Sequence, residues 1–533
     1  MTAVKLDKLL DNLGLGAAAG EGVEITGVTT DPDLCRPGFL YVAEISESVD
    51  SKRLGVRLDG RDFIDRAVTN GAVAVLTTPD VVLPEVRSAA VESARQVLLV
   101  KHDRPLTLLG ALCAKFYGQP RPQHIALVTG TNGKTSTVNF CRMLWSGAHL
   151  PACSIGNLGG VCSDGTLVWD RHPTLSVPDT VTLHKILHDV AGRGFDYVAM
   201  EATSHALFDQ RVTGLGATIG AFTNITRDHL DFHGDMEEYF RVKMTLFSEV
   251  LAPGSVAVLN ADADAGAEDF VADGVKNSNR YSQALAICHE RGHKVISYGF
   301  NGDDVRLVDC EDVENGQNLI LEIFGKKYNC HVNLSGLFQV SNVLCALSIV
   351  LGSGVPVERL LPLLPTLTEI EGRLNTVAFT PSGGRVIVDY AHSAHALRAA
   401  LEAARSLTVG KLVVVFGCGG ERDPGKRSEM GRVAAIIADQ VIVTDDNPRC
   451  EDPAEIRRAV MVGAPRALEV DNRVKAIEMA MRSLAKGDCL LIAGKGHETT
   501  QTIGEESFPY SDIETARHLA AELEQATYVK RNH

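Results

Sequence analysis

The sequence predicts an α/β protein divided into three domains. A length of 533 residues is too great for one hydrophobic core, so two to four domains are expected. Short apolar runs alternate with helical patterns through most of the chain, which favours largely parallel sheets covered by helices. In the stretch IALVTGTNGKTSTVNF (residues 125–140), an apolar strand, a glycine turn and a helix start follow one another. This order of elements predicts ligand-binding loops at the carboxyl ends of strands.

The first domain is expected to span residues 1–120. Its strands are short (GFLYVA, AVAVLTT and QVLLV), and it ends in the helical pattern PLTLLGALCAKFYG. The next segment, Gln119–Gln123, has two prolines in five residues and cannot continue that helix. We therefore expect it to be a linker.

The second domain is expected at residues 121–371, where the strands DYVAMEA, IGAFTNI and GSVAVLN alternate with helices. The pattern breaks around TEIEGRLNTVAF, so the third domain is expected at residues 372–533. There the strands KLVVVFG, QVIVT and CLLIAG are each followed by a polar loop, which is typical of a Rossmann-like layout. The last helix is expected to begin with a capping box formed by Ser511 and Glu514.

Composition excludes several classes of function. A net charge of −15 argues against a nucleic-acid partner, because such a partner requires a basic surface. No apolar run approaches the roughly 20 residues that span a bilayer, and the charged N-terminus has no apolar signal core, so no membrane insertion is expected.

The cysteine pattern bears on the compartment. The 12 cysteines are scattered, and several, such as Cys345 and Cys489, lie in apolar runs. This pattern predicts reduced, buried thiols in a cytoplasmic protein rather than a disulfide framework. No Cys-x-x-Cys pair is present to suggest a zinc knuckle.

The segment Gly130–Ser136 (GTNGKTS) is the expected phosphate loop of a P-loop-type ATPase domain. Its glycines let backbone N–H groups approach phosphate oxygens, and the following helix adds partial positive charge. Lys134 would reach the terminal phosphates, and Thr135 would place its hydroxyl on Mg²⁺. Val128 stands where the standard motif has its first glycine, so the loop is a shortened variant. The alternative is a glycine-rich turn with an incidental lysine.

Two further stretches are rich in metal-binding residue types. AMEATSHALFDQR places Glu201 just past an apolar strand, and TNITRDHLDFHGDMEEYFRVK carries His229 and, on an expected helix, Lys243. Glu201 with Thr135 suits a hard cation that bridges phosphates, and His229 is a further candidate ligand. His229 and His233 are four residues apart, which leaves zinc as an alternative, and a solvated acidic turn as another.

The order of these motifs resembles the Mur ligases, and within them the members that add meso-diaminopimelate. The resemblance covers nearly the whole chain and rests on TGTNGKTS, MEATSH, TNITRDHLDFHGDMEEYFRVK, GLFQVSN, EGR, DYAHS, FGCGGERDPGKR, TDDNPR and AGKGHE. It implies an N-terminal UDP-binding domain, a central ATPase domain and a C-terminal Rossmann-like domain that binds the amino acid.

The resemblance also implies a reaction in peptidoglycan precursor synthesis. ATP phosphorylates the D-glutamate carboxylate of UDP-MurNAc-L-Ala-D-Glu, and the amine of meso-diaminopimelate attacks the acyl phosphate. Phosphorylation gives a poorly electrophilic carboxylate a good leaving group, and cations must offset the charge of two anions brought together. The small molecules are the expected partners, and a monomer is expected.

Site residues follow from the resemblance position by position. The implied catalytic residues are Lys134, Lys243, His229 and Glu201. Two Mg²⁺ ions would be held by Thr135, Glu201, His229 and Lys243, the last as a carbamate, because an ammonium would repel the cation. The implied ATP-binding residues are Gly130, Thr131, Asn132, Gly133, Lys134, Thr135, Ser136, Asn342, Arg373 and Asp389. Spacing alone would instead favour a surface position for Lys243.

The implied diaminopimelate-binding residues lie in the three polar loops of the third domain. They are Arg422, Asp446, Asn447, Pro448, Arg449, Gly494 and Glu498. Diaminopimelate has a distal carboxylate that lysine lacks, and the guanidinium of Arg449 can grip it in a bidentate manner. Glu498 would meet a substrate ammonium. Without the resemblance, Arg449 could equally be a loop arginine paired with Glu451 or Asp452.

The nucleotide-sugar site departs most from the family pattern. Its implied residues are Pro32, Ser176, Val177, Thr203 and Arg211. Pro32 and Asp33 stand where Ser and Arg are usual, so a uracil contact at Pro32 would have to come from backbone. Asp209 stands where a glutamine is usual.

Two other functions remain open at this point. One is a folylpolyglutamate-type or other Mur-like ligase with a different amino acid or acceptor, against which DDNPR and the N-terminal domain argue. The other is a non-catalytic Mur-like scaffold, against which Lys134, Glu201, His229 and Lys243 argue.

Overall fold

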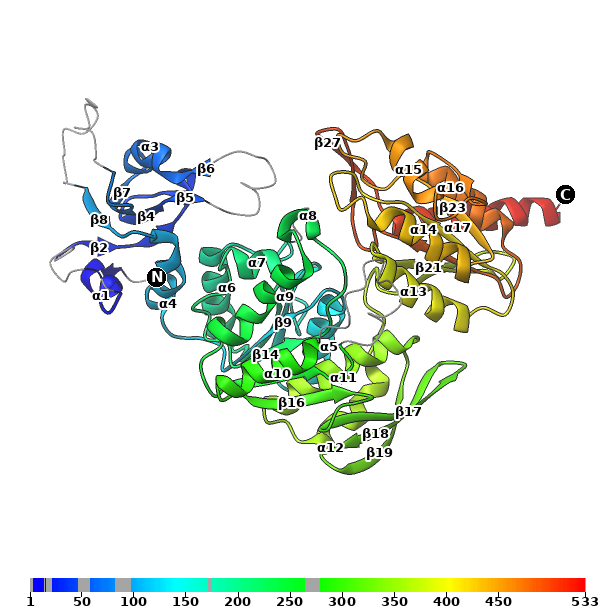
Figure 1. The fold of residues 1–533 in the computed structure, drawn as a ribbon, viewed down its shortest axis with the longest axis horizontal. Coiled ribbons are helices and arrows are strands. Elements are labelled where there is room, and N and C mark those ends of the chain that lie inside the picture. Colours follow the sequence, from blue (N-terminus) through cyan, green and yellow to red (C-terminus); the bar gives the residue numbers. More distant parts are fainter. Residues whose placement is uncertain are drawn as a thin grey trace.

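The computed structural model describes residues 3–13, 15, 22–46, 58–81, 97–170, 175–263 and 279–532. Its strands and helices group into three α/β units that follow one another along the chain (Figure 1). The predicted three-domain α/β architecture is confirmed. The boundaries at residues 121 and 371 stay predictions.

The first unit is built on four parallel strands in the order β3-β4-β7-β8. Short pairs, β1 with β2 and β5 with β6, lie beside it. Helix α4 buries Leu112, Cys113 and Phe116 in the core of this unit. The strands are β1 Val4–Lys5, β2 Glu24–Ile25, β3 Gly27–Thr29, β4 Phe39–Ala43, β5 Ile45–Ser46, β6 Leu58–Asp59, β7 Ala72–Thr77 and β8 Leu98–Lys101. The helices are α1 Leu6–Leu10, α3 Ile64–Thr69 and α4 Leu109–Tyr117.

The expected linker separates α4 from β9, the strand before the phosphate loop. Helix α4 ends at Tyr117, and the Gln119–Pro120 peptide bond is cis. Arg121 ties the linker to both units, because its guanidinium donates to the carbonyl oxygens of Ala114 and Gly214.

The middle unit contains, within the described residues, an eleven-stranded sheet in the order β12-β11-β10-β13-β9-β14-β15-β16-β17-β18-β19. Its centre, from β10 to β17, is parallel, and both edges turn antiparallel. The strands are β9 His124–Thr129, β10 Ala152–Gly156, β11 Gly159–Cys162, β12 Leu167–Trp169, β13 Tyr197–Glu201, β14 Ile219–Phe222, β15 Val256–Asn260, β16 Lys294–Gly299, β17 Val305–Val313, β18 Gly316–Ile323 and β19 Lys326–Val332.

Alternation along β9 explains why this sheet is covered on both faces. Ala126 and Val128 point into one core with residues of α5 and α11, whereas Ile125 and Leu127 point into another with residues of α6, α9 and α10. The helices are α5 Lys134–Gly147, α6 Thr180–Gly192, α7 Ser204–Phe208, α8 Leu230–His233, α9 Met236–Thr245, α10 Arg280–Glu290, α11 Leu337–Gly352 and α12 Val357–Leu360.

The third unit has a six-stranded sheet, again counted over the described part of the chain, in the order β20-β21-β25-β22-β23-β24. All neighbours are parallel except β20 and β21, as a Rossmann-like layout requires. The strands are β20 Asn375–Phe379, β21 Arg385–Asp389, β22 Leu412–Phe416, β23 Gln440–Val443, β24 Leu468–Glu469 and β25 Cys489–Ala493, with a hairpin of β26 Thr500–Ile503 and β27 Glu506–Pro509.

Helices cover both faces of this sheet as well. They are α13 Ala394–Ser406, α14 Lys426–Ile437, α15 Pro453–Met461, α16 Arg473–Ser483 and α17 Asp512–Asn532. The N–H of Glu514 donates to the Ser511 hydroxyl, which is one of the two hydrogen bonds of the predicted capping box. Among the described helices, none is long and apolar enough to cross a bilayer.

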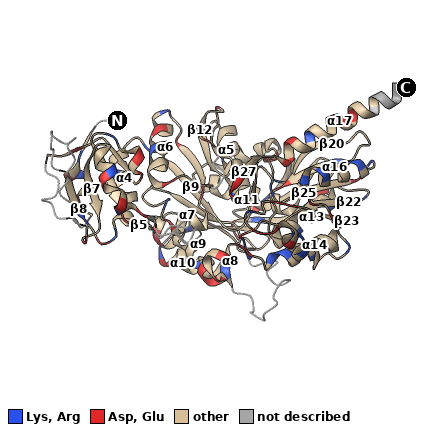
Figure 2. Cartoon of the chain, turned by 90° about the horizontal axis from the view of Figure 1, so that it is seen from above, with Lys and Arg blue, Asp and Glu red and all other residues tan. Residues whose placement is uncertain are grey.

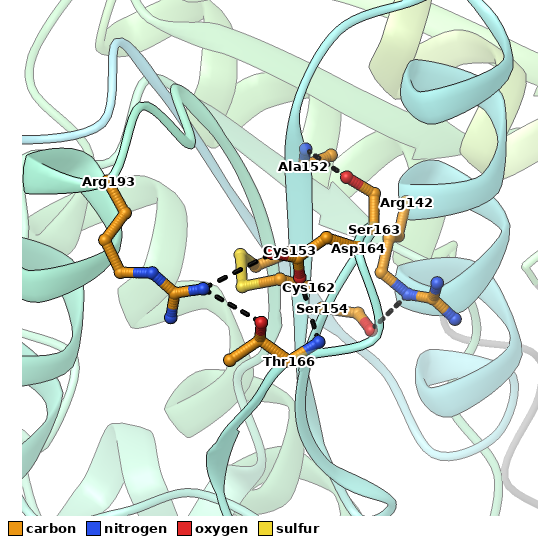
Figure 3. The surroundings of a disulfide bond; sticks show 9 residues. All are labelled: Arg142, Ala152, Cys153, Ser154, Cys162, Ser163, Asp164, Thr166 and Arg193. Carbon is orange, nitrogen blue, oxygen red and sulfur yellow. Dashed lines mark hydrogen bonds and ion pairs between the residues drawn. A yellow bond between two sulfur atoms is a disulfide. The ribbon is translucent and has the colours of Figure 1, made fainter.

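The prediction that all cysteines are reduced is wrong at one pair. Cys153 on β10 and Cys162 on β11 form a disulfide between directly paired residues of the hairpin (Figure 3). The other ten cysteines, all within the described residues, are free. The expectation failed because pairing depends on the register of β10 and β11, which brings two cysteines nine positions apart to adjacent sites.

Reducing this disulfide should lower the free energy of unfolding by about 2–3 kcal/mol. The bond closes a ten-residue loop, and that magnitude is the chain entropy that the crosslink removes from the unfolded state. Denaturant unfolding of the protein and of Cys153→Ser, each with and without reductant, measures the effect. Cys310→Ser, which removes a free thiol, should respond to reductant as the unmodified protein does. An unchanged midpoint on reduction would show that the crosslink contributes nothing.

Candidate active site

The phosphate loop joins β9 to α5, as predicted. Gly130 and Gly133 have positive φ angles of 142° and 88°, which a residue with a Cβ rarely adopts. A Cβ at Gly130 would also collide with the Thr223 hydroxyl, and one at Gly133 with the Asn342 side chain. Both glycines are therefore required by backbone conformation and by close neighbours.

Partners from the loop after β14 and from α9 hold the phosphate loop in shape. The backbone N–H of Asn132 donates to Asn224 Oδ1 at 2.9 Å, and the Thr223 hydroxyl donates to the Asn132 carbonyl at 2.6 Å. The Thr131 hydroxyl lies 3.2 Å from the Tyr239 hydroxyl. These bonds fix the loop backbone ahead of any ligand.

Lys134 begins α5 and folds back over the loop. Its Nζ donates to the carbonyl oxygens of Gly130 at 2.9 Å and Thr131 at 2.8 Å. Burial lowers the pKa of Lys134, and the charges of Glu201 and Asp228 act in the opposite direction. The amine of Lys134 therefore lies within the loop that is expected to bind phosphate.

Glu201 ends β13 and is fully buried next to the start of α5. Its Oε1 accepts from the Thr135 hydroxyl at 2.8 Å and from the Asn157 N–H at 2.9 Å. Its Oε2 is buried, and no hydrogen-bond partner reaches it from the residues that the structure describes. A buried carboxylate oxygen without a donor is costly unless a cation or water meets it, so this atom suits a metal ion.

Lys243, on α9, is buried to 1% exposure, so the alternative of a surface lysine is wrong. Its Nζ donates to the Gly130 carbonyl at 2.8 Å and lies 4.4 Å from the centre of the Tyr239 ring. Burial, reinforced by the charge of Lys134, holds the pKa of Lys243 well below its usual value. The Lys243 amine therefore lies against the phosphate loop, and its lowered pKa favours loss of its proton.

His229 lies at the start of α8 beside a buried carboxylate. Its Nε2 is 3.5 Å from Asp228 Oδ2, and burial lowers the pKa of His229 to about 4. Asp228 also lies 3.4 Å from His392 and 4.0 Å from Lys426, both in the third unit. Burial acts to raise the pKa of Asp228, but His229, His392 and Lys426 outweigh it and hold that pKa well below its usual value. His229 is thus neutral near pH 7 and able to act as a ligand.

The predicted zinc alternative has little geometric support. In the described part of the chain, no three His, Cys, Asp or Glu side chains converge in an arrangement that could hold a metal ion. Magnesium needs fewer protein ligands, because substrate phosphates and water complete its shell. Thr135 and Glu201 fit that mode of binding.

Arg373 links the phosphate loop to the third unit, while Asn342 lies against the loop at Gly133 and Asp389 lies near Arg373. Arg373 donates to the Thr135 hydroxyl at 3.0 Å, and its guanidinium lies 4.3 Å from the centre of the Tyr390 ring. Asp389 accepts from the N–H groups of Leu374 at 2.6 Å and Ala391 at 2.7 Å. Asn342 is buried on α11, where its amide donates to Gln339. All the predicted ATP-binding residues therefore lie at the loop or at the seam beside it.

The three polar loops of the third unit meet as the sequence predicts. Asn447 donates to Glu498 Oε2 at 3.0 Å and accepts from Lys495 at 2.9 Å. Asp446 Oδ2 is buried, and it lies 2.8 Å from where a Cβ on Gly494 would stand. Burial acts to raise the pKa of Asp446, but Lys495 and Arg473 outweigh it and lower that pKa.

Arg449 does not pair with Glu451, so the alternative interpretation is wrong on that point. Glu451 accepts instead from Arg427 at 2.8 Å. Arg449 Nη1 donates to the Gly420 carbonyl at 2.7 Å, which brings the guanidinium to the loop that carries Arg422. Pro448 lies at the same contact, because a Cβ on Gly420 would collide with its carbonyl.

One detail differs from the expected diaminopimelate site. Glu498 was expected to meet a substrate ammonium, yet its Oε2 accepts from the protein's own Lys495 at 2.8 Å. Lys495 is fully buried between Asn447 and Glu498. Lys495 is part of the sequence motif AGKGHE. The motif alone does not show that the Lys495 side chain turns toward Asn447 and Glu498.

Four of the five predicted nucleotide-sugar residues lie near Glu201. The Ser176 hydroxyl donates to Asn157 Oδ1 at 2.5 Å, and the Asn157 N–H donates to Glu201. Arg211 donates to the Val177 carbonyl at 3.4 Å and pairs with Asp209 at 2.5 Å. Thr203 caps α7 by accepting from Ala206.

Pro32 lies apart from this group in the first unit. Its carbonyl accepts from Asn70 at 2.9 Å. The backbone acceptor expected to contact uracil, the Pro32 carbonyl, is therefore already hydrogen-bonded to Asn70 within the first unit.

Comparisons with known proteins agree with the site. Residues 128–350 match the model of the Mur ligase middle domain, and residues 372–496 match that of the Mur ligase glutamate ligase domain. The UDP-N-acetylmuramoyl-L-alanyl-D-glutamate–2,6-diaminopimelate ligase of Zymomonas mobilis is 40% identical over 467 residues, which cover 87% of this chain and 90% of that relative.

Solved structures give the same fold. A UDP-N-acetylmuramoyl-L-alanyl-D-glutamate–2,6-diaminopimelate ligase superposes with a TM-score of 0.65 at 26% identity, covering 98% of this chain and 100% of the other. A MurF ligase from Thermotoga maritima in complex with ADP superposes with a TM-score of 0.60 at 18% identity, covering 94% of this chain and 98% of that one. The length and identity of these matches establish that the chain belongs to the Mur ligase family of ATP-dependent, amide-forming ligases.

Proposed function

We propose that this protein joins meso-diaminopimelate to the D-glutamate of UDP-MurNAc-L-Ala-D-Glu, with ATP as the energy source. The observation that carries the proposal is the burial of Lys243 against the Gly130 carbonyl of the phosphate loop, close enough to Lys134 for their charges to interact. A simple nucleotide-binding loop needs no second buried lysine, whereas a ligase that gathers two anions needs bound cations, and a carbamate on Lys243 would help to hold one. The relatives' names give the substrate, and we place the reaction in the cytoplasm.

The first step would be attack of the D-glutamate carboxylate on the γ-phosphorus, with ADP as leaving group and an acyl phosphate as product. Lys134 and Arg373 would neutralise charge on the transferring phosphoryl group, and their contacts with Gly130 and Thr135 of the phosphate loop support this role. Both cations are fixed by protein contacts before substrate arrives, so little reorganisation is needed.

Magnesium would supply charge neutralisation that the two cations cannot complete. Thr135, Glu201, His229 and Lys243 are the residues proposed to hold it, and the buried Glu201 Oε2 supports this assignment. Lys243 would serve as a carbamate, formed when its neutral amine adds to CO₂ and releases a proton. The lowered pKa of Lys243 favours that neutral amine.

The second step would be attack of a diaminopimelate amine on the acyl carbon, with inorganic phosphate as leaving group. We assign the amino acid to the three loops that carry Arg422, Asp446–Arg449, Gly494 and Glu498. Arg449 would hold the distal carboxylate, and the acidic groups would attract the ammonium.

Phosphate release tests the proposal directly. ATP and UDP-MurNAc-L-Ala-D-Glu are supplied with meso-diaminopimelate, L-lysine or L-ornithine, and release is expected only with the first. Equal release with lysine would contradict the assigned specificity. No release with any of the three would favour the scaffold or a different acceptor.

Arg449→Ala should raise the KM for diaminopimelate about 10–100-fold while the KM for ATP changes little. A charge-assisted bidentate contact is worth about 1.5–3 kcal/mol, which sets that range. Steady-state kinetics with each substrate varied in turn measures both constants. Arg458→Ala, an exposed arginine on α15, is the control and should change neither. Equal increases for both substrates would contradict the assigned contact.

A further inference from the structure

A bidentate ion pair between Arg227 and Asp423 joins the second and third units directly. Arg227, in the loop before α8, donates through Nε to Asp423 Oδ2 at 2.8 Å and through Nη2 to Asp423 Oδ1 at 3.1 Å. Asp423 lies in the loop before α14 and is 7% exposed at its side chain, whereas Arg227 is 48% exposed. The geometry is bidentate, which is the most directional form of an arginine–carboxylate contact.

Adjacent residues make a second contact with reversed charges. Asp228 faces Lys426 at 4.0 Å and His392 at 3.4 Å. The second unit thus presents a cation and then an anion, and the third unit answers with an anion and then a cation. Such a crossed pattern specifies one register of the two surfaces and disfavours others. Figure 2 shows Lys and Arg residues at α14, the helix that begins with Lys426.

The two loops in contact also border the two ends of the active site. Arg227 is two residues before His229, and Asp423 directly follows Arg422. The N–H of Gly425 donates to Asp423 Oδ1, so the carboxylate shapes its own loop as well as reaching Arg227. Burial acts to raise the pKa of Asp423, yet the hydrogen bonds from Arg227 and Gly425 outweigh it and lower that pKa.

We propose that Arg227 and Asp423 form a closure latch, a positioning pair that holds the amino-acid loops of the third unit against the ATP site of the second. Neither residue needs to touch a substrate. The latch raises the population of the closed arrangement, in which the amine pocket and the acyl-phosphate site meet. Its effect on turnover rests on the proposed function, but its effect on closure does not.

Kinetics provide the first test. Arg227→Ala and Asp423→Asn should each lower kcat/KM for diaminopimelate by about five- to tenfold, or about 1–1.4 kcal/mol. Asparagine keeps an acceptor for the Gly425 N–H, so the loop itself is preserved. Because each change breaks the same pair, the double variant should lose no more than either single variant. Arg227→Lys, which keeps the charge, should recover part of the loss.

A matched control separates the latch from ordinary surface charge. Arg306 pairs with Glu322 at 2.6 Å within the second unit and is 45% exposed, close to the value for Arg227. Arg306→Ala should change kcat/KM by less than about twofold, as expected for an exposed pair. Additive losses in the double variant, or a loss in Arg306→Ala equal to that in Arg227→Ala, would overturn the proposal.

Small-angle scattering provides the second test without any turnover. Arg227→Ala should have a larger radius of gyration than Arg306→Ala, with the same thermal midpoint for unfolding. Equal radii would overturn the latch even if the ligase activity is established. A larger radius would support it even if diaminopimelate proves to be the wrong amino acid.

Discussion

Lys243→Ala is expected to lower kcat by roughly 10²–10³-fold or more, the cost of removing a preorganised charged group from a phosphoryl-transfer site. The residue is buried against the Gly130 carbonyl, and alanine has no amine that could carry the proposed carbamate. The KM for ATP should change much less, because the phosphate loop and Lys134 remain. Steady-state phosphate release measures both constants.

A short-chain carboxylate such as acetate or propionate should partly restore the activity of Lys243→Ala. It would return the two oxygens that the proposed carbamate supplies. Lys243→Met is the matched control, because its side chain fills the space and should block the rescue. Full activity of the alanine variant without added carboxylate, or equal rescue of both variants, would contradict the carbamate.

The same lysine has a predictable effect on stability. When Lys243 is a free amine, its folded pKa lies below the unfolded value, so between those two values the unfolded state binds more protons and stability rises with pH. Methionine carries no charge to bury and removes this dependence. Lys243→Met should therefore be inactive yet at least as stable as the unmodified protein at neutral pH, as denaturant unfolding can show.

Local pattern was sufficient to predict the parts of the fold and site that are close in sequence. The strand before Gly130 and the strands before the three polar loops of the third unit all occur where the apolar runs predicted them. Their loops meet because the carboxyl ends of parallel strands share one edge of a sheet. The convergence of Asp446, Arg449 and Glu498 follows from that rule.

Features that depend on distant pairing were not predictable in the same way. Arg227 and Asp423 are 196 positions apart, and a charged residue in a polar loop is usually solvated. The spacing of Lys243 favoured a surface position, and only the packing of α9 against the phosphate loop buries it. Predicting the Cys153–Cys162 bond would have required the register of the β10–β11 hairpin. Predicting that Lys495 donates to Asn447 would have required the position of the neighbouring loop.

The largest expected effect on stability is at Arg473, the first residue of α16. Its guanidinium pairs with Asp512 through two contacts of 2.8 Å, and the two side chains are 1% and 0% exposed. It also donates to the Ala493 carbonyl at 2.8 Å, directly before Gly494, while Tyr510 donates to Asp512. One buried pair thus joins α16, β25 and α17 beneath the proposed amino-acid pocket.

Arg473→Ala should lower the free energy of unfolding by about 3–5 kcal/mol, because it leaves the Asp512 carboxylate buried without its cation. Arg482→Ala is the control on the same helix, since its exposed pair with Glu478 should be worth only about 0.3–0.5 kcal/mol. Replacing both partners, as in Arg473→Met with Asp512→Leu, should recover much of the loss, because no charge then remains to be buried. Denaturant unfolding of the unmodified protein and the three variants measures these free energies. If Arg473→Ala lost no more stability than Arg482→Ala, or if the double variant recovered none, the uncompensated Asp512 charge would not be the cause of the lost stability.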